Sequence, residues 1–164
     1  MKVLIIGGVA GGASAAARLR RLDEDAEIVI LERTGYVSYA NCGLPYYVGG
    51  VITERGKLTL QTPESFRRRF GIDVRVRTEA RSIDRDSKTV RVRRLDDGSE
   101  YDEPYDVLIL SPGAKPLMPD MSGTDDPRVM TMRTVEDTLA MRDFVTANRP
   151  RSAVVAGGGY IGLE

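Results

Sequence analysis

The first third of the chain consists of two short apolar runs with a helical segment between them. Residues Lys2–Ile6 form an apolar run that ends at a glycine, which is typical of a buried parallel strand. Residues 13–22 are rich in Ala, Leu and Arg, which favour helix, and residues 26–31 form a second β-rich run. The pattern therefore predicts a strand–helix–strand unit of about 30 residues.

The middle of the chain predicts further helices and strands, followed by a meander. Two expected helices and two expected strands are, in chain order, 41–48, Pro63–Phe70, 72–76 and 105–110. Apolar and polar residues tend to alternate between residues 79 and 103, and turn signals stand at 84–87 and 96–98. We therefore interpret residues 79–103 as an antiparallel β-meander.

The last third of the chain predicts a linker, a helix and one more strand. Residues 116–127 are rich in Pro, Gly, Asp and Ser, which is typical of a linker. Thr134 is the expected N-cap of a helix over 134–148, and Asp137 stands at the spacing of a capping box. Residues 152–156 form another apolar run, which we expect to be a buried strand.

Composition excludes several classes of protein. The 164 residues carry 24 basic and 24 acidic side chains, with 41% hydrophobic and 29% charged residues. This is globular composition, and it excludes disorder, collagen-like structure or a coiled coil as the main architecture. The neutral balance gives no general reason to bind nucleic acid or an acidic membrane. The longest apolar runs are far shorter than the ~20 residues of a membrane helix.

The counts of histidine and cysteine exclude further chemistry. The chain has no His, so it has no Ser-His or Cys-His pair and no His-ligated zinc, and we expect no metal site. Its single Cys makes no intrachain disulfide and fits a reducing compartment. The N-terminal apolar run is too short for a signal peptide. We therefore expect a cytoplasmic protein.

A glycine-rich turn follows the first predicted strand. Gly7, Val9 and Gly12 occupy the register of GxGxxG, with Val9 in place of the middle glycine. Glu32 follows Gly12 by 20 residues, where a carboxylate would bind an adenosine ribose. A tight strand-to-helix turn in another α/β fold is the alternative interpretation. The order of strand, turn, helix, strand and Glu32 favours dinucleotide binding.

A second turn matches the motif fully near the end of the chain. Gly157, Gly159 and Gly162 follow the predicted strand at 152–156, and Glu164 comes two residues later. Two such units imply two dinucleotides, one for each unit. The chain ends at Glu164, before a second helix could form, so we expect it to be part of a longer protein.

Cys42 stands in the segment 38–47, which reads SYANCGLPYY. We expect it near the N-terminus of a short helix, where the helix dipole and free N–H groups favour the reactive thiolate. Ser38 and Asn41 could donate hydrogen bonds to this sulfur or to a bound thiol. A buried structural cysteine is the alternative interpretation.

Four stretches carry a resemblance to a known family. They are residues 5–14 (IIGGVAGGAS), 38–46 (SYANCGLPY), 105–114 (YDVLILSPGA) and 157–164 (GGGYIGLE). With these stretches the chain resembles the FAD-dependent pyridine nucleotide-disulfide oxidoreductases, and within them the single-cysteine coenzyme A-disulfide reductases. The resemblance implies an FAD/NAD(P)-binding Rossmann-like three-layer α/β fold with an antiparallel β-meander, truncated here. It also implies an FAD-binding domain over 1–115 and a linker with the start of an NAD(P)-binding domain over 116–164.

The resemblance further implies a mechanism and a set of site residues. NADH or NADPH would reduce FAD, and electrons would pass to Cys42, which cycles between a thiolate and a mixed disulfide with coenzyme A. The implied FAD contacts are Gly7, Gly8, Val9, Ala10, Gly11, Gly12, Glu32, Arg33, Asn41, Cys42, Ala80, Ser111 and Gly113. The implied coenzyme A contacts are Ser14, Arg18, Arg21, Ser38 and Asn41, and the NAD(P) turn is Gly157, Gly159, Gly162 and Glu164. The full-length protein would be a homodimer.

Related branches and other classes of function stay open at this point. Branches with a CxxxxC pair are disfavoured because only Cys42 exists. The NADH oxidase and peroxidase branch uses a cysteine sulfenate and has His in the first turn, where this chain has Ala10. Persulfide or polysulfide reductases share the single-cysteine motif. An isolated FAD-binding module without turnover and a thiol-based redox sensor are the alternatives outside catalysis.

Overall fold

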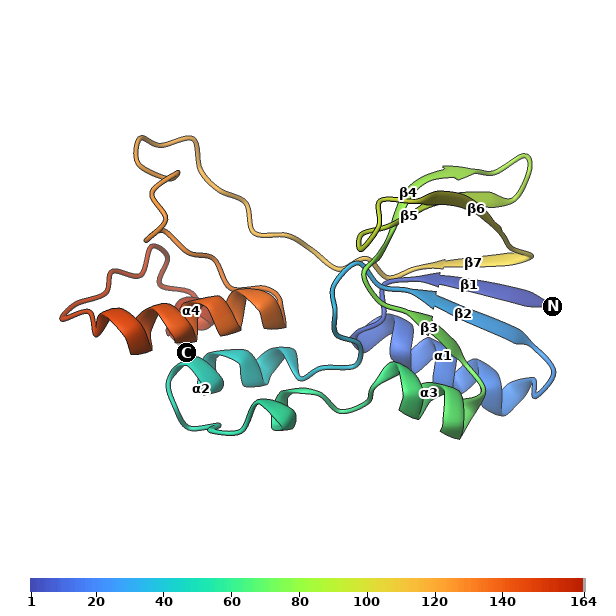
Figure 1. The fold of residues 1–164 in the computed structure, drawn as a ribbon, viewed down its shortest axis with the longest axis horizontal. Helices are drawn as coiled ribbons and strands as arrows, with labels where there is room; N and C mark the ends of the chain where they lie inside the picture. Colours follow the sequence, from blue (N-terminus) through green and yellow to red (C-terminus); the bar gives the residue numbers. More distant parts are fainter. Residues whose placement is uncertain (164) are drawn as a thin grey trace. The chain divides into compact units, whose positions relative to one another are not determined.

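Four of the predicted strands lie side by side in one parallel sheet of the computed structural model, which describes residues 1–163. The sheet has the order β3-β2-β1-β7, and its strands are β1 (Lys2–Ile6), β2 (Glu27–Leu31), β3 (Asp73–Arg75) and β7 (Val107–Leu110). Helices α1 (Ala10–Leu22) and α3 (Pro63–Phe70) cover one face of this sheet (Figure 1). The order confirms the predicted strand–helix–strand unit.

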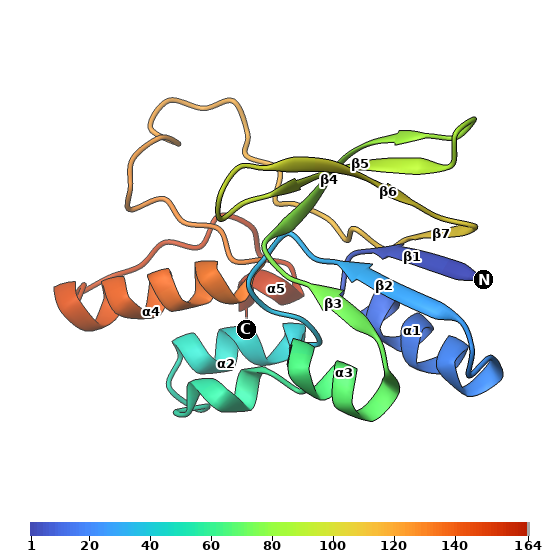
Figure 2. The same ribbon diagram turned by 45° about the vertical axis from the view of Figure 1, so that its right-hand side comes forward.

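The predicted meander covers the other face of the sheet (Figure 2). Its antiparallel strands are β4 (Thr78–Asp84), β5 (Thr89–Arg94) and β6 (Glu100–Pro104). Alternate residues of the central strands point to opposite faces, as the period of a strand requires. Ile5 and Ile30 pack in the cluster with α1 and α3, whereas Leu4 and Leu31 pack with residues of β5. This arrangement confirms the three-layer α/β fold and the meander at 79–103.

An arginine joins α1 to the end of α3. Arg20 Nε donates to the carbonyl of Phe70 at 2.7 Å, and Nη2 donates to the carbonyl of Ala26 at 2.7 Å. Its guanidinium also donates to the carbonyls of Glu24 and Gly71. The last carbonyls of a helix lack intrahelical donors, so Arg20 supplies them from a neighbouring element. The sequence analysis predicted no role for Arg20.

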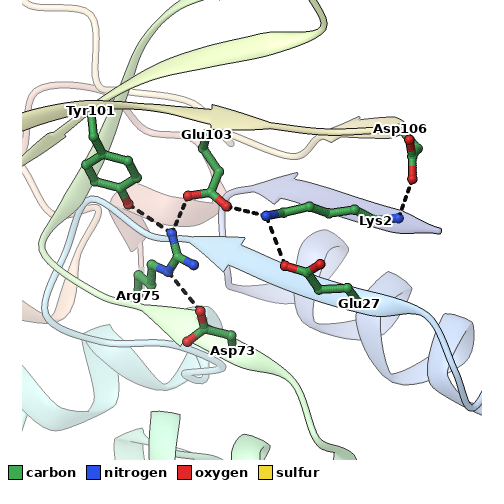
Figure 3. Close-up of polar contacts among 7 residues, drawn as sticks. All are labelled: Lys2, Glu27, Asp73, Arg75, Tyr101, Glu103 and Asp106. Carbon is green, nitrogen blue, oxygen red and sulfur yellow. Dashed lines mark hydrogen bonds and ion pairs between the residues drawn. The ribbon is translucent and has the colours of Figure 1, made fainter.

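A buried carboxylate joins the meander to the parallel sheet (Figure 3). Glu103 of β6 contacts Lys2 Nζ at 2.7 Å and accepts a hydrogen bond from Arg75 of β3. Lys2 also pairs with Glu27 at 2.9 Å, and Arg75 pairs with Asp73 at 2.8 Å. Burial raises the pKa of Glu103, but the hydrogen bonds from Lys2 and Arg75 outweigh it, so the pKa lies below its ordinary value.

These three layers form the first of two compact units, which comprises Met1–Tyr39 and Thr59–Ala114. The second unit comprises Ala40–Leu58 and the residues from Lys115 onward. Its helices are η1 (Asn41–Gly43), α2 (Leu44–Val48), η2 (Arg55–Leu58), α4 (Val135–Asn148) and α5 (Tyr160–Leu163), of which η1 and η2 are 3-10 helices. The predicted division into domains after residue 115 stays a prediction.

In the second unit, helix α4 begins with a capping box and is joined to α2 by the side chain of Arg142. Thr134 caps α4, and its capping box with Asp137 is formed as predicted, with N–H to oxygen distances of 3.1 and 2.9 Å. Arg142 of α4 donates to the carbonyls of Tyr47 and Val48 at 3.1 and 2.7 Å. These carbonyls lie at the C-terminal end of α2, where they need donors from outside the helix.

Two expectations about secondary structure are corrected by the structure. Helix α1 begins at Ala10 instead of residue 13, because Gly11 and Gly12 are helical despite their weak propensity. Residues 152–156 form no strand, and Val154 is 94% exposed. A strand requires a hydrogen-bonded neighbour, and no strand within residues 1–163 pairs with this run. None of the helices formed by the described residues is long and apolar enough to cross a membrane.

Candidate functional site

Three strands of the first unit end at one edge of the parallel sheet. The glycine turn follows β1, Glu32 follows β2 and Ser111 follows β7. Because β1 lies between β2 and β7, the chain leaves β1 at a point where the strand order reverses. Ligands of open α/β sheets bind at such a point, beside the carboxyl ends of the strands.

The glycines of the first turn are required by close backbone contacts. Gly7 has a φ of +96°, and a Cβ there would lie 2.0 Å from the carbonyl oxygen of Ser111. A Cβ on Gly12 would lie 1.8 Å from the carbonyl oxygen of Gly7, and one on Gly11 would lie 3.1 Å from Ser111 Oγ. No side chain fits at Gly7 or Gly12 without moving the backbone. The middle position of the motif carries Val9, which is half-buried.

The N-terminus of α1 presents backbone N–H groups at this edge. The first intrahelical bond runs from the N–H of Ala13 to the carbonyl of Val9 at 3.0 Å. The N–H groups of Ala10, Gly11 and Gly12 precede it and have no acceptor inside the helix. Val9 occupies the N-cap position, and its side chain makes no capping hydrogen bond to the helix. A glycine turn with uncapped N–H groups fits a pyrophosphate.

Glu32 is held on both its backbone and its side chain. Glu32 is 6% exposed. Its backbone N–H donates to the carbonyl of Arg75, and its carbonyl accepts the N–H of Thr78, each at 2.9 Å. Oε2 accepts the N–H of Gly8 at 2.8 Å, and Oε1 accepts the N–H and hydroxyl of Thr34 at 2.8 and 2.9 Å. Sequence reasoning found Glu32 from its spacing but missed Thr34. The available signal was a Thr three residues after the last residue of β2, in a segment where a hydroxyl side chain favours a turn.

Three predicted coenzyme A contacts share an exposed face of α1. Ser14, Arg18 and Arg21 are exposed and follow one another at i, i+4 and i+7, so they lie along one side of the helix. Ser38 lies beside the glycine turn, because its N–H donates to the carbonyl of Gly8 at 2.9 Å. The structure thus brings Ser38, the glycine turn and Glu32 together.

Three predicted FAD contacts of the first unit lie outside this set of hydrogen bonds. Arg33 is exposed, and its guanidinium lies 4.0 Å from the carboxylate of Glu79. Ala80 is half-buried on β4 and packs against the cluster between the meander and the sheet. Gly113 is exposed with a φ of +72°.

The second unit holds the predicted thiol. Cys42 is exposed and free, and it lies in η1 at the start of the helical segment that continues as α2. This placement matches the predicted helix N-terminus and excludes the alternative of a buried structural cysteine. Beside it in sequence, Asn41 has a buried Oδ1 without a hydrogen-bond partner among the described residues. An amide oxygen in this state requires a donor that the described residues do not supply.

The second glycine turn repeats the geometry of the first. Gly157 has a φ of +116°, and a Cβ on Gly162 would lie 2.2 Å from the carbonyl oxygen of Gly157. Gly159 directly precedes α5, as expected for the N-terminus of a helix. Glu164 of the predicted NAD(P) turn lies outside the described residues. Within residues 1–163, no group of three or more acidic or Cys side chains is placed to hold a metal ion.

A family model described as pyridine nucleotide-disulphide oxidoreductase matches residues 1–164. This chain belongs to that family. A curated coenzyme A disulfide reductase from Staphylococcus haemolyticus is 39% identical over 163 residues, which is 99% of this chain and 36% of the relative. The chain therefore spans little more than a third of the length of such relatives.

Solved structures of the same family are similar to the whole chain or most of it. Reduced CoADR-RHD from Bacillus anthracis is 50% identical with a TM-score of 0.97, over 99% of this chain and 29% of that one. An NAD-dependent persulfide reductase from A. fulgidus is 38% identical with a TM-score of 0.85, over 90% and 28%. A water-forming NADH oxidase from Lactobacillus brevis is 30% identical with a TM-score of 0.92, over 99% and 36%.

These comparisons confirm the predicted family and class of enzyme. The family is that of the pyridine nucleotide-disulphide oxidoreductases, and the solved relatives include a structure bound to NADH, which confirms the expected cofactors at the level of the family. Their names include reductases of coenzyme A disulfide and of persulfide and an oxidase. The substrate of this chain's full-length protein is therefore a proposal, as are the roles of individual site residues.

Proposed function

We propose that the full-length protein containing this chain is an FAD-dependent NAD(P)H:disulfide oxidoreductase that reduces coenzyme A disulfide through Cys42. The observation that carries this proposal is the exposed Cys42 at the beginning of a helical segment, in a chain with no other cysteine. A mechanism with one protein thiol needs a substrate sulfur as the second partner of each disulfide. A symmetrical low-molecular-weight disulfide supplies it.

The chemistry at Cys42 balances in two steps. The Cys42 thiolate attacks one sulfur of coenzyme A disulfide, which forms a mixed disulfide and releases one coenzyme A thiolate. Two electrons that originate from NAD(P)H then break the mixed disulfide, which restores the Cys42 thiolate and releases the second coenzyme A. The sum is one disulfide, one NAD(P)H and one proton converted to two thiols and NAD(P)⁺. An exposed sulfur is required for both steps.

The first unit fits the adenosine diphosphate half of FAD. Gly7, Gly11 and Gly12 leave space for close backbone approach, and the uncapped N–H groups of α1 fit the pyrophosphate. Glu32 provides a buried carboxylate for a ribose. When bound, FAD supplies the two-electron transfer between the nicotinamide and the disulfide. Arg33, Ala80, Ser111 and Gly113 are proposed as further contacts, as are Asn41 and Cys42 in the second unit.

The exposed face of α1 fits the phosphates of coenzyme A. Arg18 and Arg21 place two cations on this face, and Ser14 adds a hydroxyl one turn away. Guanidinium groups bind phosphate through charge-assisted hydrogen bonds, and often through two at once. We propose Ser38 and Asn41 as further contacts. For Asn41 the supporting observation is its buried amide oxygen, which has no hydrogen-bond partner among the described residues. The second glycine turn, with Gly157, Gly159, Gly162 and Glu164, is proposed for NADH or NADPH.

The similarity to a persulfide reductase supports a second candidate, in which Cys42 accepts sulfur from a persulfide or polysulfide. The similarity to an NADH oxidase supports a third, in which Cys42 cycles through a sulfenate. Ala10 disfavours the third candidate, because the oxidase and peroxidase branch has His at this position. We also propose a homodimer, as the family resemblance implies, and a cytoplasmic location, because one free cysteine suits a reducing compartment.

The test compares full-length wild-type protein with the Cys42→Ser variant. NAD(P)H oxidation is followed with coenzyme A disulfide, with coenzyme A persulfide or with oxygen, and flavin reduction is followed separately by absorbance. We expect Cys42→Ser to abolish disulfide reduction while flavin reduction by NAD(P)H persists. Equal disulfide reduction by the variant would contradict the role of Cys42.

Intact mass of Cys42 peptides under non-reducing conditions distinguishes the candidates. A coenzyme A adduct supports disulfide reduction, an added sulfur supports the persulfide candidate, and one added oxygen supports the oxidase. FAD binding without NAD(P)H oxidation would indicate a binding module. A reactive Cys42 without flavin reduction would indicate a redox sensor.

A further inference from the structure

The carboxylate of Glu32 already has three hydrogen-bond donors from its own turn. Oε2 accepts the N–H of Gly8, and Oε1 accepts both the N–H and the hydroxyl of Thr34, at 2.8 to 2.9 Å. Two of these donors are backbone groups whose positions are fixed by the turn and by the bond from the N–H of Arg77 to the carbonyl of Thr34. The hydroxyl is the one donor of the three that can rotate.

The hydroxyl of Thr34 also has a second acceptor within reach. Its Oγ1 lies 2.9 Å from Glu32 Oε1 and 3.0 Å from the carbonyl oxygen of Tyr36. A threonine hydroxyl carries one proton, so it donates fully to one of these oxygens at a time. Rotation about a single side-chain bond exchanges the two acceptors without moving the backbone.

A ribose diol competes with this hydroxyl. An ionised carboxylate offers about four acceptor positions, of which three are filled by the donors of the turn. The two hydroxyls of a ribose need two positions, so one existing donor must leave. We propose that Thr34 is a positioning residue that acts through Glu32: its hydroxyl satisfies the buried carboxylate before a ribose binds and turns to the Tyr36 carbonyl when the diol binds. This inference rests on the proposed binding of FAD.

The exchange has consequences of opposite sign for stability and affinity. Before binding, the hydroxyl makes a charge-assisted bond that stabilises the protein, and after binding it makes a weaker neutral bond to a carbonyl. Thr34→Val keeps the shape and the N–H but removes the hydroxyl. The variant is therefore less stable without ligand, yet it binds the diol more tightly because no strong bond must be exchanged.

The experiment uses apoprotein prepared from the full-length protein, with FAD binding measured by flavin fluorescence. We expect Thr34→Val to lower the melting temperature of the apoprotein and to lower the dissociation constant of FAD roughly fivefold. Thr34→Ser restores both values, because it restores the hydroxyl. Thr131→Val is the matched control, since Thr131 is exposed and lies outside the candidate site.

A second probe isolates the ribose. An FAD analogue that lacks the 2′-hydroxyl of its adenosine needs one position on Glu32, so we expect Thr34→Val and wild type to bind it equally. Weaker FAD binding by Thr34→Val, or an equal change for FAD and the analogue, would overturn the inference. Wild-type protein that binds no FAD would instead overturn the proposed function.

Discussion

The contact between Glu103 and two cations gives a quantitative test of how the meander is held on the sheet. The Glu103 side chain is 7% exposed, and it bridges Lys2 of β1 and Arg75 of β3 (Figure 3). Glu103→Gln keeps the shape but removes the charge. Breaking a fully buried ion pair costs about 3–5 kcal/mol. The Lys2 and Arg75 side chains are 21% and 30% exposed, so water compensates them in part, and we expect about 2–3 kcal/mol.

The neighbouring residue on the same strand provides a matched control. Asp102 pairs with Arg91 at 3.2 Å, but the two side chains are 56% and 46% exposed. Exposed pairs contribute about 0–1 kcal/mol, so Asp102→Asn should change the free energy of unfolding little. Urea unfolding of wild type and both variants at pH 7 measures the two costs. Equal costs for the two variants would refute the reasoning, because burial is what separates them.

The same pair predicts a dependence on pH with a definite sign. Burial raises the pKa of Glu103, but its bonds to Lys2 and Arg75 prevail and place it below the ordinary value of 4.5. The stabilisation is therefore fully present above pH 4.5 and is lost as the pH falls through the folded-state pKa. We expect the deficit of Glu103→Gln to shrink on acidification from pH 7 to roughly pH 3. A deficit that stays constant over this range would show that charge is not its cause.

Two further predictions concern caps. Arg20→Met removes donors from the carbonyls of Phe70 and Ala26, and we expect it to lower the free energy of unfolding by about 2–3 kcal/mol. The exposed neighbour Arg21 gives the control, since Arg21→Met should change the free energy of unfolding by no more than about 0.5 kcal/mol. Equal shifts in melting temperature for Arg20→Met and Arg21→Met would contradict the role of Arg20. Thr134→Ala removes half of the capping box of α4, and we expect it to lower the free energy of unfolding by about 1 kcal/mol. Thermal unfolding measures this, and an unchanged melting temperature would contradict the prediction.

Elements with local signals at both ends could be predicted to the residue. The expected helix Pro63–Phe70 is α3 with the same bounds, because Thr62 caps its start and Gly71 ends it in the left-handed conformation. Strand β5 (Thr89–Arg94) likewise lies between the two turns predicted at 84–87 and 96–98. The start of α1 could not be predicted from propensity, since its first turn contains Gly11 and Gly12. Those glycines are helical because the turn requires close backbone contact there, which propensity does not describe.

The candidate site shows the same division between spacing and orientation. The glycine turn and Glu32 could be predicted because the length of a strand–helix–strand unit places them at one sheet edge. The contact of Thr34 with Glu32 could not be predicted in this way. Outside the site, the contacts of Arg20 could not be predicted either, because Arg18, Arg20 and Arg21 are the same residue type and only the fold turns Arg20 toward the carbonyls of Phe70 and Ala26. The hydrogen bonds that hold Glu32 likewise depend on the conformation of the turn and not on spacing.

The two glycine turns separate what a motif encodes from what a sheet supplies. Gly162 approaches the carbonyl of Gly157 as Gly12 approaches that of Gly7, so both turns close in the same way. The strand before the first turn is paired on both sides, whereas residues 152–156 before the second are exposed and form no strand. The closed turn is therefore a property of the local glycine spacing. The preceding strand depends on neighbouring strands, which is why its apolar sequence alone predicted it wrongly.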